Sequence, residues 1–185
     1  MKIFLIALII LVSNSLYSAT ILIDPGHGGE EKGAISKIDG TEEKDLALEL
    51  AYKIRNHLLA SHHVYLTRTG DQTLTLEQRS ASAQKIGADI FISIHANSSE
   101  SSSSNGFETF YLNNNVDAAV KKVVRIENGE HSHPMHNELT GDTLTGHILA
   151  EIVVGENIPR SKKLGEMIHE SIHTSISKKY KIKNR

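Results

Sequence analysis

Three short apolar segments alternate with two helical patterns between residues 20 and 94, and this alternation restricts the fold more than any other feature. The apolar segments are Thr20–Asp24, His63–Thr67 and Ala88–Ile94, which are rich in β-branched residues and are predicted to be strands. Strand, helix, strand, helix, strand is typical of an α/β domain. The sequence therefore predicts a mostly parallel sheet flanked by helices.

Both intervening segments carry helix signals. In the first segment, an apolar residue recurs at every fourth position, which predicts one buried face: Leu46, Leu50, Ile54 and Leu58. Thr41 is the predicted N-cap of this helix. In the second segment, Thr75 and Gln78 match a capping box, and the helix is predicted to end near Gly87.

The second half of the chain is less regular. Residues 97–105 are Ser-rich and are predicted to form a surface loop before a strand at Phe107–Leu112. Val116–Glu127 is predicted to be a helix. Ser161 is the predicted N-cap of a last helix, whose apolar positions share one face: Leu164, Ile168, Ile172 and Ile176.

Residues 1–19 have the layout of a secretory signal peptide. Lys2 precedes the apolar run Ile3–Val12, and small polar residues follow up to Ala19. The apolar run is short for a bilayer span, so no permanent membrane span is expected, although an uncleaved N-terminal anchor stays an alternative. We therefore expect an exported protein, located in the periplasm, in the extracellular space or at the cell wall.

Composition narrows the classes of function. The net charge is −2 and aromatic residues make up 5% of the chain, which argues against a nucleic-acid partner. Cysteine is absent, so disulfides and thiol nucleophiles are excluded. A metal site would have to use His, Asp and Glu, and eleven histidines are available.

Three residues in the first half carry the predicted chemistry. His27 directly follows the first predicted strand, His95 directly follows the third, and Glu43 lies in the first turn of the intervening helix. Ligands gather at the carboxyl ends of parallel strands, so these side chains are expected to meet. Two histidines and one carboxylate form the ligand set of a catalytic zinc site. Taken singly, each residue is more often a turn residue or a partner of the helix dipole, and it is their joint placement at strand ends that favours a metal site.

Four motifs carry a resemblance to a known family. They are IDPGHGG at Ile23–Gly29, EKDLAL at Glu43–Leu48, LTR at Leu66–Arg68 and FISIHAN at Phe91–Asn97. In order and spacing, the chain resembles the zinc-dependent N-acetylmuramoyl-L-alanine amidases from Ile21 to about Ile176. The resemblance implies a phosphorylase/hydrolase-like α/β fold, in which a twisted, mostly parallel sheet is flanked by helices.

The same resemblance implies a site and a reaction. His27, Glu43 and His95 match the metal ligands, which implies one Zn²⁺ per chain. The implied reaction is hydrolysis of the amide bond between N-acetylmuramic acid and L-alanine, with peptidoglycan as the substrate. Arg68 and Arg79 match recurrent family positions and are expected to brace loops or the sheet. We expect a monomer.

The family takes its general base from a Glu on a final strand that follows the helix matching Ser161–Ile176. The 185 residues end at Arg185, so the last strand and this Glu are expected to be missing, and the catalytic base is unknown. The domain at residues 20–185 is therefore expected to be incomplete at its C-terminus. The alternative function is a catalytically impaired fragment that binds zinc or peptidoglycan.

A second resemblance concerns an inserted helical segment at about residues 113–160. Arg125–Asn128 and His147–Glu151 resemble the insertion of the cell-separation amidases, in which a Glu blocks the zinc until an activator displaces it. Glu127 matches that Glu, so the hypothesis is a fourth, autoinhibitory metal ligand and a protein activator at the inserted helix. The alternative is a solvated carboxylate at a helix end.

Overall fold

The computed structural model describes residues 18–98, 106–111 and 144–180, with the backbone alone described at residues 144–156 and 178–180. The chain forms two compact units, Met1–Ala96 and Asn97–Arg185. The described elements are β1 (Thr20–Pro25), α1 (Glu43–Leu58), β2 (His63–Leu66), α2 (Leu76–Ile86), β3 (Ile90–Ile94) and α4 (Leu144–Tyr180).

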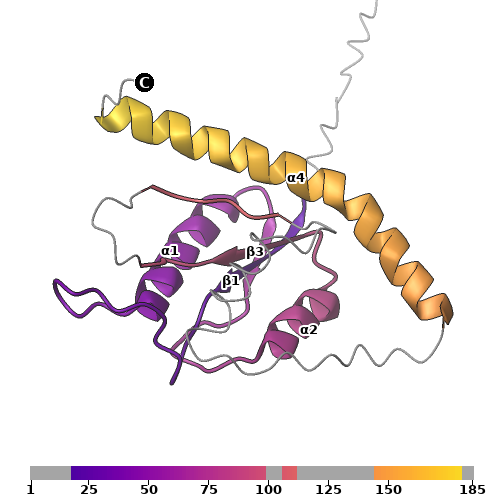
Figure 1. Cartoon of the computed structure of the whole chain (residues 1–185), viewed down its shortest axis with the longest axis horizontal. Coiled ribbons are helices and arrows are strands. Elements are labelled where there is room, and N and C mark those ends of the chain that lie inside the picture. The colour runs from indigo at the N-terminus through magenta and orange to yellow at the C-terminus, as the bar shows by residue number, and fades with distance from the viewer. Residues whose placement is uncertain (1–17, 99–105, 112–143, 181–185) are drawn as a thin grey trace, which may run out of the picture. The chain divides into compact units, whose positions relative to one another are not determined.

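Three parallel strands form the sheet of the first unit, in the order β2-β1-β3. Ile21 is level with Val64 of β2 and with Ile90 of β3, so β1 lies in the centre. Because all three strands run the same way, their carboxyl ends lie at one edge of the sheet (Figure 1). The predicted parallel α/β architecture is confirmed for this unit.

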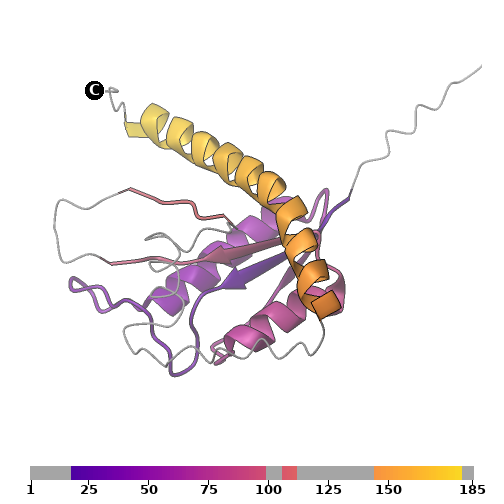
Figure 2. The ribbon, with the colours of Figure 1, turned by 45° about the vertical axis from the view of Figure 1, so that its right-hand side comes forward.

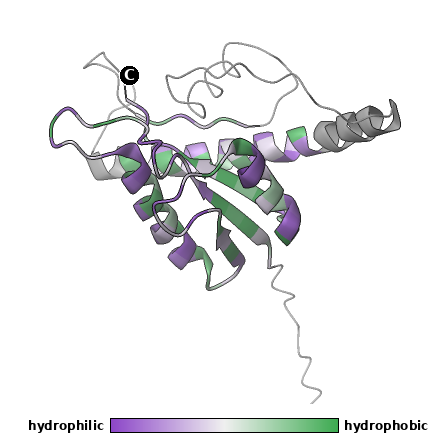
Figure 3. Cartoon of the chain, turned by 90° about the horizontal axis from the view of Figure 1, so that it is seen from below, coloured by the Kyte–Doolittle hydropathy of each residue, from purple (hydrophilic) through white to green (hydrophobic). Residues whose placement is uncertain are grey.

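The two helices of this unit cover opposite faces of the sheet. Ile21 and Ile23 of β1 join Ala47 and Ala51 of α1 in the hydrophobic core. Asp24, whose side chain projects to the other face, is bonded to Arg79 of α2. Figures 1 and 2 show the strands between the two helices, and Figure 3 shows the strands as mainly hydrophobic.

The buried face of α1 differs from the predicted one. Leu46 and Leu50 are 44% and 46% exposed, whereas Ala47 and Ala51 are buried against the sheet. Alanine lets the helix approach the sheet closely, and Ile54 and Leu58 complete the packing. Glu43 lies four residues before Ala47, so this register turns its carboxylate toward the sheet.

The N-terminus of α1 is also displaced from the prediction. The N-cap is Glu42 rather than Thr41, and no side chain caps the helix there. Instead, the N–H of Glu43 donates to the carbonyl of Ala34 at 2.8 Å, and that of Lys44 to the carbonyl of Lys32 at 3.2 Å. Backbone carbonyls of the preceding loop therefore satisfy helix donors that side chains commonly satisfy.

The capping box of α2 is confirmed. Thr75 Oγ1 accepts from the Gln78 N–H at 3.2 Å, and Gln78 Oε1 accepts from the Thr75 N–H at 2.9 Å. Gly87 ends the helix in the left-handed conformation, with φ of 60°.

We predict that Thr75→Ala lowers the free energy of unfolding by about 1 kcal/mol, because one N-terminal donor of α2 loses its acceptor. Chemical denaturation of the variant measures this. Thr75→Ser retains the hydroxyl and should stay close to the parent chain; equal losses in the two variants would show that the methyl group, not the cap, matters.

The second unit departs from the sequence prediction at two places. Residues 107–111 do not form the expected strand in the described part of the chain. Alternate side chains of this segment lie against α4 instead: the ring of Phe107 lies 4.6 Å from that of His169, and Thr109 and Tyr111 lie beside Gly165.

Ser161 does not begin a helix, because α4 runs without interruption from Leu144 to Tyr180. Pro159 lies inside it. Proline removes one backbone donor, which bends a helix without ending it when the hydrogen-bond ladder continues on both sides. Figure 2 shows the bend in the orange part of α4.

Two sequence predictions fall mainly on other parts of the chain. The signal peptide at residues 1–19 lies almost entirely outside the described residues, and the helix Val116–Glu127 lies wholly outside them. Among the described helices, none has the length and apolar character that crossing a bilayer requires.

Candidate metal centre

His27, Glu43 and His95 come together at the carboxyl edge of the sheet. Each offers one ligand atom, and these atoms all lie within 4.8 Å of one another. His27 follows β1, Glu43 is the first residue of α1, and His95 follows β3. The topology therefore brings the three predicted side chains into one cluster that could hold a metal ion.

The carboxylate of Glu43 is the centre of this cluster. Its Oε1 lies 3.4 Å from His27 Nε2 and 3.2 Å from His95 Nδ1. The same oxygen accepts from the Ala96 N–H at 2.7 Å, and Oε2 accepts from the Ala34 N–H at 2.8 Å. Both oxygens are thus fixed by backbone donors, which orients the carboxylate toward the two imidazoles.

The electrostatics keep this carboxylate ionised. Burial acts to raise the pKa of Glu43, which is only 4% exposed. The contacts with His27 and His95 and the N–H groups of Ala34 and Ala96 outweigh burial and hold that pKa well below its usual range. A negative charge is therefore present at neutral pH where a cation would bind.

The loop that carries His27 has an uncommon backbone. His27 has φ of 59°, in the left-handed region that few residues other than glycine adopt. Gly28 and Gly29 follow with φ of 131° and 61°. Such conformations persist where the surroundings impose them, and they gather at functional sites. The turn aims the imidazole of His27, which is 5% exposed, at Glu43.

Two buried arginines impose that conformation. Arg79 donates to Asp24 Oδ1 at 2.7 Å and to the carbonyl of His27 at 2.8 Å. Arg68 donates to the carbonyls of Gly26 at 2.9 Å and Lys44 at 2.7 Å. These contacts tie the His27 loop to α1 and α2, so the predicted bracing role of both arginines agrees with the geometry.

Two further braces were not predicted from the sequence. Asp24 accepts from Arg79, Thr67 and Ser93 and is almost fully buried. On the other side of the loop, Lys44 Nζ donates to Asp71 Oδ2 and to the carbonyl of Gly29, both at 2.8 Å. The sequence signal for Asp24 is its position inside the motif IDPGHGG, three residues before His27.

Close approach explains two glycines of the site. A Cβ atom on Gly26 would lie 2.4 Å from Cε1 of His95. A Cβ atom on Gly33 would lie 2.5 Å from Cδ2 of His27 and 2.8 Å from Oε2 of Glu43. Only a hydrogen atom fits at these positions without displacing the cluster.

We predict that Gly33→Ala lowers both the stability of the chain and its affinity for a metal ion. The left-handed φ of 66° alone costs about 1–2 kcal/mol for a non-glycine residue, and the methyl group would also displace His27 or Glu43. Gly40→Ala is the matched control, since Gly40 has φ of 76° with open space around it. Thermal unfolding and zinc titration should separate the two variants; equal metal affinity would contradict the prediction.

Glu127, the predicted autoinhibitory ligand, lies outside the described residues. Among the described residues, the group of His27, Glu43 and His95 is the one set of three or more ligand-type side chains close enough to share an ion.

The sequence that contains this site matches a known protein family. Residues 21–185 match the family model described as N-acetylmuramoyl-L-alanine amidase. The chain belongs to this amidase family. The match starts at the second residue of β1 and includes all three residues of the cluster.

Individual amidases agree with this assignment. The amidase AmiC of Escherichia coli O6:H1 is 34% identical over 152 residues, which cover 80% of this chain and 36% of AmiC. The catalytic domain of the amidase CwlV from Bacillus (Paenibacillus) polymyxa has a TM-score of 0.50 at 38% identity, over 58% of this chain and 60% of that domain.

A third amidase is similar in fold. The CwlD amidase from Clostridioides difficile, solved in complex with the GerS lipoprotein, has a TM-score of 0.51 at 23% identity, over 84% of this chain and 100% of CwlD. The chain spans between 20% and 36% of the length of the first three curated relatives that it matches.

Proposed function

We propose that this chain supplies the catalytic domain of a zinc amidase that hydrolyses the bond between N-acetylmuramic acid and L-alanine in peptidoglycan. The observation that carries the proposal is the convergence of His27, Glu43 and His95 in a chain of the amidase family. Two histidines and one carboxylate leave the fourth position of a tetrahedral zinc ion open, as a catalytic site requires.

Two distances in the cluster match those between neighbouring ligands of zinc. Ligand bonds of about 2.0–2.1 Å at tetrahedral angles place neighbouring ligand atoms about 3.3 Å apart. The two imidazole nitrogens lie 3.4 Å and 3.2 Å from Glu43 Oε1. The ligand atoms of the three residues all lie within 4.8 Å of one another, so the side chains would draw closer together around the ion. Their mixed nitrogen and oxygen donors suit the chemistry of zinc.

Zinc held by these residues would polarise the amide carbonyl and lower the pKa of a water molecule. Other groups of the chain hold the three side chains in position. The N–H groups of Ala34 and Ala96 hold the Glu43 carboxylate in place, and Arg79 holds the carbonyl of His27. Ligands fixed by such outer contacts lose little freedom on binding, which favours a defined reaction geometry.

The proposal includes the organisation predicted from the sequence. Residues 1–19 direct export to the periplasm or cell wall, and residues 20–185 form the amidase domain with an insertion at about 113–160. CwlD was solved with a lipoprotein, which supports a protein partner for this chain as well. We assign Glu127 in the insertion to autoinhibition, with a protein activator that displaces it.

Release of dye from labelled peptidoglycan tests the function. The zinc-loaded Glu127→Ala variant, which lacks the proposed autoinhibitory ligand, is expected to release dye faster than the parent chain; a chelator is expected to abolish the release, and added Zn²⁺ is expected to restore it. Analysis of the products should show free L-alanine amino groups, because the amide bond is the one that breaks. Release that a chelator leaves unchanged, or no release by the zinc-loaded Glu127→Ala variant, would contradict the proposal.

A further inference from the structure

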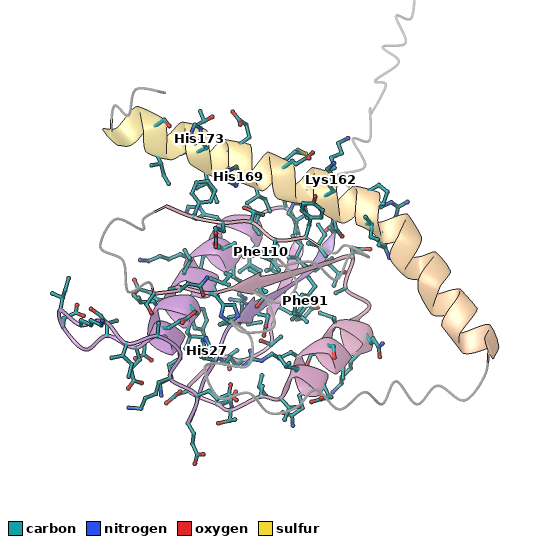
Figure 4. All side chains as sticks on the ribbon, in the orientation of Figure 1. His27, Phe91, Phe110, Lys162, His169 and His173 are labelled. Atoms are coloured by element: carbon teal, nitrogen blue, oxygen red, sulfur yellow. The ribbon has the colours of Figure 1, made fainter. Side chains whose placement is uncertain are left out.

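Residues 169–173 of α4 read HESIH, which places two histidines four residues apart on a helix. Side chains at this spacing lie on the same face, with Cβ atoms about 5–6 Å apart. Both His169 and His173 are exposed. Figure 4 labels them one turn apart on α4. Paired imidazoles at i and i+4 are a recurring arrangement for binding a metal ion.

The surroundings of His169 orient its ring. The imidazole packs on Phe107, with ring centroids 4.6 Å apart and planes tilted by 42°. Its Nδ1 lies 3.4 Å from Thr109 Oγ1. A metal-binding histidine is commonly held in this way, with one ring nitrogen bonded to the protein and the other directed to the metal. This arrangement leaves Nε2 of His169 as the ligand atom.

Acidic residues lie on the same face of α4. Glu166 and Glu170 precede His169 and His173 by three residues each, so the four residues follow the i, i+3, i+4, i+7 spacing of one helix face. Glu166 lies 3.8 Å from Lys162, and Glu170 accepts from Thr174 Oγ1 at 3.4 Å. Two carboxylates beside two imidazoles favour the approach of a divalent cation.

We propose that His169 and His173 form an accessory site for a divalent transition-metal ion such as Zn²⁺. The site differs from a metalloprotease centre, which adds a third protein ligand. Within the described residues, one group of three or more ligand-type side chains is close enough to share an ion, and it consists of His27, Glu43 and His95. The α4 pair therefore has no third ligand among the described side chains. Water completes the coordination, so the ion binds more weakly than at the His27 cluster.

Equilibrium dialysis against Zn²⁺ tests the site, with His173→Ala as the main variant. The substitution removes an exposed ligand and leaves the contact between His169 and Phe107 in place. We expect this variant to bind one weak zinc equivalent fewer than the parent chain and to retain the tight equivalent. His57→Ala removes an exposed histidine of α1 that has no histidine four residues away, and it should bind as many equivalents as the parent.

His27→Ala gives the reciprocal pattern. It should lose the tight equivalent and keep the weak one, so failure of the accessory site and failure of the proposed zinc centre are distinguishable. Circular dichroism checks that α4 is intact in the His173 variant. An intact His173→Ala chain that binds as much Zn²⁺ as the parent would overturn the proposal.

Discussion

Replacing Arg79 by alanine is expected to lower the free energy of unfolding by about 3–5 kcal/mol, because it leaves the buried carboxylate of Asp24 without its ion partner. Asp24 and Arg79 are 1% and 4% exposed, and water cannot readily replace the lost guanidinium. The variant also loses the hydrogen bond to the carbonyl of His27. Denaturant unfolding measures the loss of stability. Zinc titration measures the effect of the lost hydrogen bond, which we expect to lower zinc affinity by about 10- to 100-fold.

Two controls identify the cause. Lys53→Ala breaks an exposed ion pair with Glu49 and should change stability by less than about 1 kcal/mol. The double variant Asp24→Asn, Arg79→Ala should lose less free energy of unfolding than the sum of the losses in the two single variants. The reason is that the double variant no longer buries the unpaired carboxylate of Asp24. Strict additivity of the two changes would contradict the assigned ion pair.

His95→Ala is expected to reduce zinc affinity by more than about 100-fold, because loss of a ligand should exceed the cost of losing an outer-shell partner. Amidase activity should fall with it at any zinc concentration below the new dissociation constant. Competition with a chromophoric chelator measures the affinity. The side chain is partly buried beside Gly26, so thermal unfolding is recorded on the same sample.

The matched control for His95→Ala is His57→Ala, an exposed histidine on α1. It should retain both zinc affinity and activity. A His95→Ala chain that is folded and binds zinc as tightly as the parent would show that the three side chains form a hydrogen-bonded cluster and not a metal site.

The sequence was sufficient to predict the three-residue cluster because each residue is tied to an element end. His95 directly follows β3, His27 lies two residues after the end of β1, and Glu43 begins α1. The carboxyl ends of parallel strands lie at one edge of the sheet, so a prediction of where the strands end also predicts where the two histidines lie. The capping box at Thr75 is similarly local, since both of its hydrogen bonds lie within four residues.

Contacts between residues far apart in the chain were not predictable in this way. Asp24 and Arg79 are 55 residues apart, and nothing near either residue indicates the other. The buried face of α1 was mistaken for the same reason. Leucines usually mark the packed side of a helix, but here two alanines allow a closer approach to the sheet and the leucines are half exposed.

The error at α4 has a different origin. Ser161 is a typical N-cap residue and predicted a helix start that the structure lacks, whereas Pro159 lies inside α4. A helix that continues on both sides of proline loses one hydrogen bond and bends, which preserves the rest of the ladder. The sequence near Ser161 therefore indicates the position of an irregularity, but the irregularity is a proline inside α4 and not the start of a helix.

Anomalous diffraction at the zinc edge, from crystals grown with Zn²⁺, tests the metal centre most directly. We expect the strongest peak within about 2.0–2.2 Å of an imidazole nitrogen of His27, an imidazole nitrogen of His95 and a carboxylate oxygen of Glu43. A structure in which those three side chains keep their direct contacts while zinc occupies other residues would contradict it.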